Sequence, residues 1–516
     1  MRLHLAPDLH ADDINRQYQE IRAVTASGPN SIALLSAQEI ASAVHRRTLS
    51  AVKVFEATVE RIERHNGQLN AIVRFDPEVG RSQAREADAR ATAGEKLPLL
   101  GVPFTVKDSL WVRGSLATQG SKLFENFIAP QDSLAVARLR SAGAVYIGAT
   151  NCPEFAAKGV TENLLYGVTR NPWRTQDGKC CTTGGSSGGS ASAVAAGFGS
   201  FSLGTDAGGS IRRPAAHCGI VGFKPSHGLV PDPHGFTDAS MGLSVVGPMA
   251  RTAGDIALIL RCIMGYDARD PQSILLPEHM TALDVMRLPS TGLRIAFSRD
   301  LGCGFSCDPD VMCAVESAVA MLRQRGFQVE STDPHWPAIT ATYEELACEE
   351  AGLASLYGDA WRAGSPKMDV TIGQLIDTGT RRSGVEIAQA MLRRRPIHES
   401  LARFFDEVDL LICPTAPVTA WPLDENLPQT IGGKPAGFRG HAAFTPLFNI
   451  CGVPACSVPV GFVRGLPVGL QIIGPRFSDE RVLQMARFIE QLLPQPSCPL
   501  ASPDIFIDKT DRRDEI

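Results

Sequence analysis

Gly184-Gly185-Ser186-Ser187-Gly188-Gly189-Ser190 and, after an Ala-rich segment, Gly204-Thr205-Asp206-Ala207-Gly208-Gly209-Ser210-Ile211-Arg212-Arg213-Pro214-Ala215 form the stretch on which the interpretation of this chain depends. Its glycines stand beside hydroxyl side chains, so the backbone can adopt positive φ and approach a bound group closely. Neither the phosphate-loop pattern G-x-x-x-x-G-K-[ST] nor the dinucleotide pattern G-x-G-x-x-G is present. The stretch instead favours an oxyanion hole beside a nucleophilic hydroxyl. We expect its donors to be the backbone N–H groups of Ala207, Gly208, Gly209 and Ser210.

A serine nucleophile needs a neighbouring base, because its hydroxyl is weakly acidic. His217 and His227 are the closest histidines, but neither lies in a recognisable triad pattern, and a G-x-S-x-G motif with its ordered triad partners is missing. Lys107 follows an apolar, strand-like run that would bury it. Burial lowers the pKa of a lysine, and a lysine near neutrality can accept a proton. Lys107 is therefore the candidate base.

Three blocks of sequence in a fixed order carry a family resemblance: the serine-glycine stretch, Gly222-x-Lys224-Pro225 after it, and Pro103-x-x-x-Lys107-Asp108 before it. Together they resemble the amidase signature family, and the resemblance extends over roughly residues 34–492. It implies an α/β fold with a central mixed β-sheet covered by helices on both sides. It also implies one large domain, although a chain of 516 residues would by length alone suggest two or more.

The resemblance assigns roles to individual residues. Ser210 corresponds to the nucleophile, Ser186 to a relay serine preceded by a cis peptide bond, and Lys107 to the base of a Ser–cis-Ser–Lys triad. We expect Thr205, Asp206 and Arg212 to support the loop rather than react. The implied activity is hydrolysis of a non-peptide amide C–N bond through an acyl-enzyme, with no metal or organic cofactor, and esters or carbamates are expected as side substrates.

A second function shares these motifs, namely the glutaminase (A) subunit of a tRNA-dependent Asp/Glu amidotransferase, which works inside a multisubunit assembly. Such subunits typically carry a Met-Tyr-containing segment where this chain has residues 440–449, and this departure favours a stand-alone hydrolase. Glutamine would also require a carboxylate-binding Arg that the sequence does not locate. Trp111, Phe124 and Phe155 lie in segments that could line an acyl pocket for an aromatic or apolar group. An inactive scaffold is disfavoured, because the whole triad is present.

Composition narrows the expected partners and location. The net charge of −5 and the lack of a basic block argue against nucleic acid as a partner. Thirteen cysteines are an odd number, and their scattered positions favour neither a disulfide framework nor a zinc site. The pair Cys180-Cys181 is interpreted as ordinary loop residues, with a redox-sensitive gate as the alternative. Without a signal-like or long apolar segment we expect a cytoplasmic enzyme of small-molecule amides, with no membrane partner; a homodimer is common among similar proteins.

The sequence also predicts how the chain is organised. We expect an N-terminal arm over 1–30, one domain over 31–498 with its signature core at about 100–230, and a C-terminal tail over 499–516. Ser36 and Glu39 form a capping box that predicts the start of a helix. The further predicted elements are a strand at 100–106, helices at 134–141 and 190–197, a strand at 144–147, an amphipathic helix at 311–324, and a helical segment at about 340–400.

Overall fold

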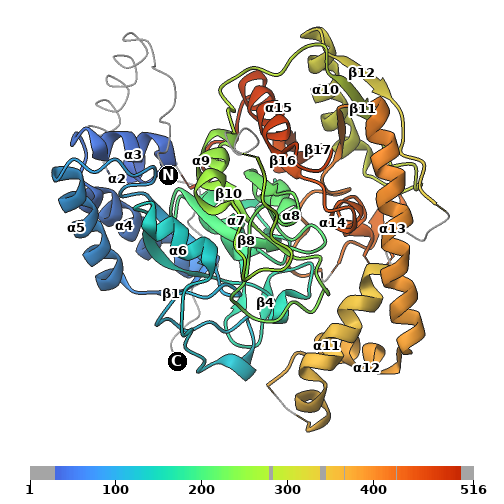
Figure 1. Cartoon of the computed structure of the whole chain (residues 1–516), viewed down its shortest axis with the longest axis horizontal. Helices are drawn as coiled ribbons and strands as arrows, with labels where there is room; N and C mark the ends of the chain where they lie inside the picture. Colours follow the sequence, from blue (N-terminus) through green and yellow to red (C-terminus); the bar gives the residue numbers. More distant parts are fainter. Residues whose placement is uncertain are drawn as a thin grey trace.

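The computed structural model of the chain describes residues 29–277, 283–337, 344–364, 367–425, 427–437 and 439–500. Nearly all of the predicted N-terminal arm and C-terminal tail lies outside these ranges. The described chain is built on an 11-stranded sheet with helices packed on both of its faces (Figure 1). The predicted fold class, an α/β architecture with a central mixed sheet, is confirmed.

The central sheet is mixed. In one half of the sheet, β2 is parallel to both of its neighbours, β3 and β8. In the other half, β11 is parallel to both of its neighbours, β12 and β13. Antiparallel strand pairs connect the two halves. In spatial order the strands are β1 (Ile72–Phe75), β3 (Val145–Thr150), β2 (Pro103–Lys107), β8 (Phe201–Asp206), β10 (Val245–Ala250), β9 (Val221–Lys224), β16 (Ala455–Val463), β17 (Leu466–Ile473), β13 (Leu410–Pro414), β11 (Arg294–Phe297) and β12 (Gln328–Ser331).

Helices surround this sheet, and short two-stranded ribbons lie in its loops. The helices are α2 (Pro29–Ile32), α3 (Ala37–His45), α4 (Ala51–Leu69), α5 (Pro77–Thr92), α6 (Leu134–Ser141), α7 (Gly188–Ala196), α8 (Arg212–Cys218), α9 (Ala253–Ile263), α10 (Pro309–Gln324), α11 (Glu344–Arg362), α12 (Val370–Arg381), α13 (Gly384–Glu407), α14 (Leu447–Ile450) and α15 (Asp479–Leu492). The ribbons are β4 (Glu162–Asn163) with β5 (Gly167–Val168), β6 (Arg170–Arg174) with β7 (Cys180–Thr182), and β14 (Thr430–Ile431) with β15 (Lys434–Pro435).

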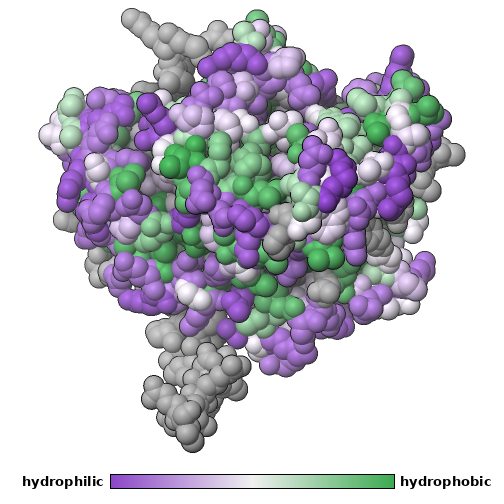
Figure 2. Space-filling view, turned by 90° about the horizontal axis from the view of Figure 1, so that it is seen from below, coloured by the Kyte–Doolittle hydropathy of each residue, from purple (hydrophilic) through white to green (hydrophobic). Residues whose placement is uncertain are grey.

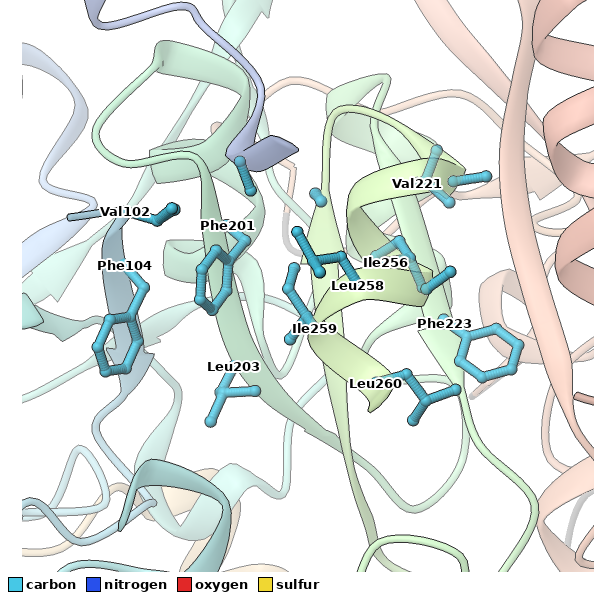
Figure 3. Close-up of a cluster of buried hydrophobic side chains, with 14 of the residues drawn as sticks. Val102, Phe104, Phe201, Leu203, Val221, Phe223, Ile256, Leu258, Ile259 and Leu260 are labelled. Atoms are coloured by element: carbon cyan, nitrogen blue, oxygen red, sulfur yellow. The ribbon is translucent and has the colours of Figure 1, made fainter. Parts of the chain in front are cut away.

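The two faces of the sheet bury different kinds of side chain. On one face, Phe104, Phe201 and Phe223 belong to the same buried apolar cluster as the hydrophobic residues of α9, part of which Figure 3 shows. The other face is covered by α7 and α8, whose small residues form a separate buried cluster. Because alternate strand residues point to opposite faces, β8 contributes Phe201 and Leu203 to the first face. A tightly packed, small-residue helix therefore lies behind the serine-glycine loop, as the sequence predicts.

Several predicted boundaries are close to the observed ones. The capping box at the start of α3 is present: Glu39 N donates to Ser36 Oγ at 3.1 Å, and Ser36 N donates to the Glu39 carboxylate at 2.7 Å. The strand expected at 100–106 is β2, which begins three residues later and includes Lys107 itself. The helix predicted at 190–197 is α7, which begins inside the glycine run at Gly188.

Helices α11, α12 and α13 form a group at the lower right of Figure 1, away from α3, α4 and α5. They account for the helical segment expected at 340–400; part of it, residues 340–343 and 365–366, lies outside the described ranges. Within the described ranges, no helix combines the length and apolar composition needed to cross a bilayer. Hydrophobic and hydrophilic residues are interspersed on the face shown in Figure 2.

Candidate active site

The sheet topology brings the candidate base and the candidate nucleophile loop to one edge. β2 and β8 are parallel neighbours, with Val106 opposite Leu203, so their carboxyl ends lie side by side. Lys107 is the last residue of β2, and Asp206 is the last residue of β8. Open α/β sheets bind ligands at the carboxyl ends of their strands. The site therefore lies where this topology favours one.

Lys107 is fully buried and makes two hydrogen bonds. Its Nζ donates to Ser186 Oγ at 2.7 Å and to Thr205 Oγ1 at 2.8 Å. Burial, which penalises the charged ammonium, lowers the pKa of Lys107 to about 8, although the charge of Asp206 acts in the opposite direction. An appreciable fraction of Lys107 is therefore neutral near physiological pH. The expected depression of its pKa is present.

Ser186 lies in a loop that only small residues can form. The peptide bond between Gly185 and Ser186 is cis. A side chain at Gly188 would overlap with the hydroxyls of Thr161 and Thr183, so the loop packs without space for one. The next serine fixes the loop to the second block, because Ser187 N donates to Ser210 O at 3.0 Å. Ser186 and Ser210 consequently lie on one wall of the same cavity.

The Ser210 loop folds around the carboxylate of Asp206. Gly209 N donates to Asp206 Oδ1 at 2.7 Å, and Ile211 N donates to Asp206 Oδ2 at 3.0 Å. Of the four expected oxyanion donors, the Gly209 N–H is thus bound to a carboxylate in this structure. The N–H groups of Ala207, Gly208 and Ser210 donate to no protein acceptor within the described part of the chain.

Asp206 and Arg212 form a fully buried ion pair, with Arg212 Nη2 donating at 2.8 Å. Burial alone raises the pKa of Asp206, but the guanidinium of Arg212 outweighs it, and the net pKa lies well below the ordinary value. The pair lies beneath the loop that Asp206 and Arg212 are expected to support, and its hydrogen bonds hold that loop.

The second half of the chain completes this network. Arg212 Nη1 also donates to Gln471 Oε1 at 2.7 Å and to Thr445 O at 3.0 Å. Asn449 Nδ2 donates to the Asp206 backbone carbonyl at 2.9 Å, and Thr445 Oγ1 donates to Gly208 O at 2.8 Å. Sequence reasoning matched the segments around Asn449 and Gln471 to the family without giving these side chains a role. Their polarity within apolar strand and helix segments is the signal that could have indicated one.

The histidines do not take the place of Lys107. His217 is buried on α8, and burial lowers its pKa to about 3, so the ring is neutral. His227 lines the cavity, where its Nε2 lies 3.1 Å from Gln272 Oε1. Neither histidine hydrogen-bonds to Ser186 or Ser210 within the described ranges.

A cavity of about 490 Å³ opens above the two serines. Phe155, Phe236 and Tyr357 supply its aromatic wall, and Gln119 and Ser109 add polar groups. Of the three aromatic residues suggested by the sequence, Phe155 lines the cavity. Trp111 and Phe124 do not line it; they pack behind Phe236, with ring centroids 5.8 and 4.9 Å from it.

The charged residues on the cavity wall are all acidic. They are Asp232, Asp238, Asp270 and Glu349, and the described wall contains no Lys or Arg. Glu349 is paired with Arg439 at 2.8 Å. Burial and the neighbouring carboxylates of Asp270 and Asp238 raise the pKa of Asp232 to about 7, so its charge is only partial near neutral pH. Asp238 and Asp270 remain on the wall without a Lys or Arg neighbour in the described lining, which favours neutral or cationic molecules over anionic ones.

Among the residues that the structure describes, no group of three or more His, Cys, Asp or Glu side chains is placed to hold a metal ion. Cys180 is partly exposed and Cys181 is buried, and both are free thiols. Burial raises the pKa of Cys181 to about 11, so this thiol is not activated.

Comparison with known proteins places the chain in a class of enzymes that act on amide C–N bonds. The chain belongs to the amidase signature family, since the family model described as Amidase matches residues 53–483. The chain is 36% identical over 480 residues to the A subunit of glutamyl-tRNA(Gln) amidotransferase from Dechloromonas aromatica (strain RCB). The alignment covers 88% of this chain and 96% of that protein.

Two solved structures show how similar the fold is to those of relatives with different names. A bacterial aryl acylamidase of the amidase signature family superposes with a TM-score of 0.83 at 27% identity, covering 91% of this chain and 99% of that one. The A subunit of glutamyl-tRNA(Gln) amidotransferase from Thermotoga maritima superposes with a TM-score of 0.73 at 28% identity, covering 91% of this chain and 97% of that one. The common fold therefore does not separate the stand-alone enzyme from the amidotransferase component.

Proposed function

We propose that this chain hydrolyses an amide through an acyl-enzyme formed on Ser210, with Ser186 and Lys107 transferring the protons. The observation that carries the proposal is the 2.7 Å hydrogen bond between Lys107 Nζ and Ser186 Oγ, in a buried position where the pKa of the lysine is about 8. A neutral lysine is a competent general base, and an adjacent base is what a serine nucleophile requires.

In the proposed first step, Ser210 Oγ attacks the amide carbonyl carbon. The Ser210 proton moves to Ser186 Oγ as the Ser186 proton moves to neutral Lys107 Nζ, so one proton is transferred in net terms. The free N–H groups of the Ala207–Gly208 turn and of Ser210 supply donors for the negative charge on the carbonyl oxygen. The fixed loop keeps these donors oriented before the reaction begins.

In the second step of the proposed reaction, the C–N bond breaks, and the proton held on Lys107 returns through Ser186 to the leaving nitrogen. Ammonia or an amine departs, and Ser210 remains as an ester. Water then attacks this ester with the same pair acting as base, and the product carboxylate is released. The chain's own residues suffice for every proton transfer in this scheme.

The substrate that the cavity supports best is a neutral or cationic small-molecule amide. Free glutamine carries an α-carboxylate, and a buried carboxylate needs a positive partner. The described wall offers Asp232, Asp238, Asp270 and Glu349 and no Lys or Arg. The aromatic wall favours amides with an aryl or apolar group.

A second candidate is the glutaminase component of a tRNA-dependent amidotransferase. The curated relative at 36% identity is an amidotransferase component, and this similarity favours the second candidate more directly than the stand-alone hydrolase that the sequence motifs suggested. In that role the chain would release ammonia from glutamine within an assembly. Arg439 would then have to exchange Glu349 for the carboxylate of glutamine.

The test is release of ammonia or amine by the purified chain from aryl, aliphatic and amino-acid amides and from glutamine. Turnover of an aryl or aliphatic amide that Ser210→Ala abolishes would support the proposal, whereas turnover that survives in Ser210→Ala would refute the acyl-enzyme. Activity confined to glutamine would favour the amidotransferase component. Arg439→Met separates the two candidates further, because it should abolish glutamine turnover and spare turnover of neutral amides.

A further inference from the structure

Three residues far apart in the chain form one unit in the wall of the cavity: Gln119, Phe155 and Tyr357. Phe155 N donates to Gln119 O at 2.9 Å, and the rings of Phe155 and Tyr357 are stacked with centroids 3.7 Å apart. Tyr357 OH donates to Gln119 Oε1 at 3.2 Å. All three residues line the cavity that contains Ser210, and Tyr357 brings α11 to the wall.

This arrangement fixes the orientation of the Gln119 amide. Its oxygen accepts from Tyr357, so the Nε2 donors point elsewhere, and Nε2 has no hydrogen-bond acceptor within the described ranges. The Gln119 side chain is not free to rotate away, because only 8% of the residue is exposed. Gln119 therefore presents an unused N–H group on an otherwise aromatic wall.

A second residue that lines the same cavity also has a polar group without a partner. Ser109 is 8% exposed, lines the same cavity, and its buried Oγ has no hydrogen-bond partner among the described residues. Asp108 joins the two positions: Gln119 N donates to Asp108 O at 3.1 Å, and Asp108 Oδ1 accepts from Thr118 N at 2.9 Å. Buried polar groups without partners are rare, because each costs about 1–3 kcal/mol. Ser109 Oγ is one such group, whereas Gln119 Nε2 is open to the cavity, so a ligand bound there can supply the acceptor that Nε2 lacks.

The surroundings restrict the chemistry of that acceptor. The stacked rings of Phe155 and Tyr357 suit a flat aromatic group. An anionic acceptor such as a carboxylate is disfavoured by the acidic residues Asp238 and Asp270 of the cavity. The remaining class is an aryl group that bears a neutral acceptor, namely an ether, carbonyl or hydroxyl oxygen.

We propose that Gln119 is a specificity-determining residue of this enzyme: it donates a hydrogen bond to a neutral oxygen substituent on the aryl group of the substrate, and Tyr357 is the positioning residue that orients the Gln119 amide. The inference rests on the proposed function, since it names the substrate class of the Ser210 site.

The experiment compares pairs of aryl amides that differ in one group, methoxy against ethyl, at each ring position. The two groups have similar size, but only methoxy accepts a hydrogen bond. One neutral hydrogen bond changes affinity by about tenfold, so we expect the wild type to favour a methoxy amide in kcat/KM by about tenfold at one ring position, mainly through KM. A ratio near one at every position would overturn the inference.

Variants assign that preference to residues. Gln119→Met keeps the length of the side chain and removes its donor, and should reduce the methoxy-to-ethyl ratio to about one. Tyr357→Phe should reduce the ratio partly, because the Gln119 amide can then rotate. Gln374→Met makes the same change at an exposed position of α12 and should leave the ratio unchanged. A merely structural role for Gln119 would lower both rates and preserve the ratio, which would contradict the proposal.

Binding measurements distinguish a failure of the proposed subsite from a failure of the proposed function. Calorimetry with Ser210→Ala measures the affinity of both amides without turnover. If the wild type turns over neither amide but Ser210→Ala prefers the methoxy compound and Ser210→Ala/Gln119→Met does not, the proposed reaction fails and the subsite stands. If both are turned over and the ratio survives Gln119→Met, the reaction stands and the subsite is refuted. Should Gln119→Met not fold, Gln119→Glu replaces the donor by an acceptor, and a surviving methoxy preference would likewise refute the subsite.

Discussion

Replacing Lys107 by Met provides the sharpest test of the site, because both the stability and the activity of the wild type should rise with pH and neither rise should be seen in the variant. In the folded chain burial holds the pKa of Lys107 at about 8, against an ordinary lysine value of 10.5. The unfolded chain therefore binds an extra proton between these two pH values, and the wild type gains stability as the pH rises through this window. Lys107→Met has no such group and should lack this gain.

The size of the effect follows from the two pKa values. Keeping a charged Lys107 buried costs the folded state about 3 kcal/mol near pH 7, and the cost falls to about 1.5 kcal/mol near pH 9.5. The hydrogen bonds that the variant loses to Ser186 and Thr205 alter its stability by a nearly constant amount. We therefore expect the wild type to gain about 2 kcal/mol relative to Lys107→Met between these pH values.

Urea unfolding of both proteins at the two pH values measures this difference. Parallel changes in the two proteins would refute the depressed pKa of Lys107, and with it the argument that the lysine serves as a base. The activity of the wild type should increase with pH, as its stability does. The kcat/KM of the wild type should rise about tenfold per pH unit below the pKa and level off above it, because only neutral Lys107 accepts the proton. Lys107→Met should have only a low residual activity without this profile.

Three further predictions, one of them with a control substitution, test packing at the site and the cap of α3. Gly209→Ala should cost about 2–3 kcal/mol and lower kcat, because Gly209 has φ +112° and a side chain there would overlap with Thr445 Oγ1. Gly114→Ala, also at positive φ but in open space, should cost less, and equal losses would refute the overlap. Arg212→Met leaves a buried carboxylate without its partner and should cost about 3–5 kcal/mol in urea unfolding; a loss below about 1 kcal/mol would contradict the pairing. Ser36→Ala removes the cap of α3 and should cost about 1 kcal/mol, and an unchanged unfolding midpoint would show that the cap is dispensable.

Much of the fold and part of the site could be predicted from residues that are close together in the sequence. The capping box at Ser36 and the apolar run before Lys107 are decided by neighbours within a few residues, and the structure places both elements close to where they were expected. The Gly-Ser loops were recognisable because a side chain at Gly188 or Gly209 would overlap with buried threonines. Steric constraints of this kind can be recognised in the sequence because they require small residues at fixed spacings.

The rest depended on contacts between distant segments. Gln119 is hydrogen-bonded to Tyr357, which is 238 residues away in the sequence, and Arg212 is hydrogen-bonded to Gln471, which is 259 residues away. No periodicity or spacing in the sequence relates such residues, since the contacts arise only when the sheet and α11 are assembled. For the same reason the sequence suggested Trp111 and Phe124 for the pocket wall, whereas they pack one layer behind it. The engagement of the Gly209 N–H was likewise not visible, because it depends on how the loop turns back toward Asp206.

The position of Asp206 explains why the two halves of the chain must come together for this site to exist. Its carboxylate accepts hydrogen bonds from the residues on both sides of Ser210, so the placement of the nucleophile depends on a buried charge. That charge is tolerable only because Arg212 compensates it, and Arg212 is in turn held by Gln471 of β17. The aromatic wall attaches separately, through Tyr357 on α11. Changes in α11 can therefore alter which amide is bound while the geometry of Ser210 is maintained by another part of the chain.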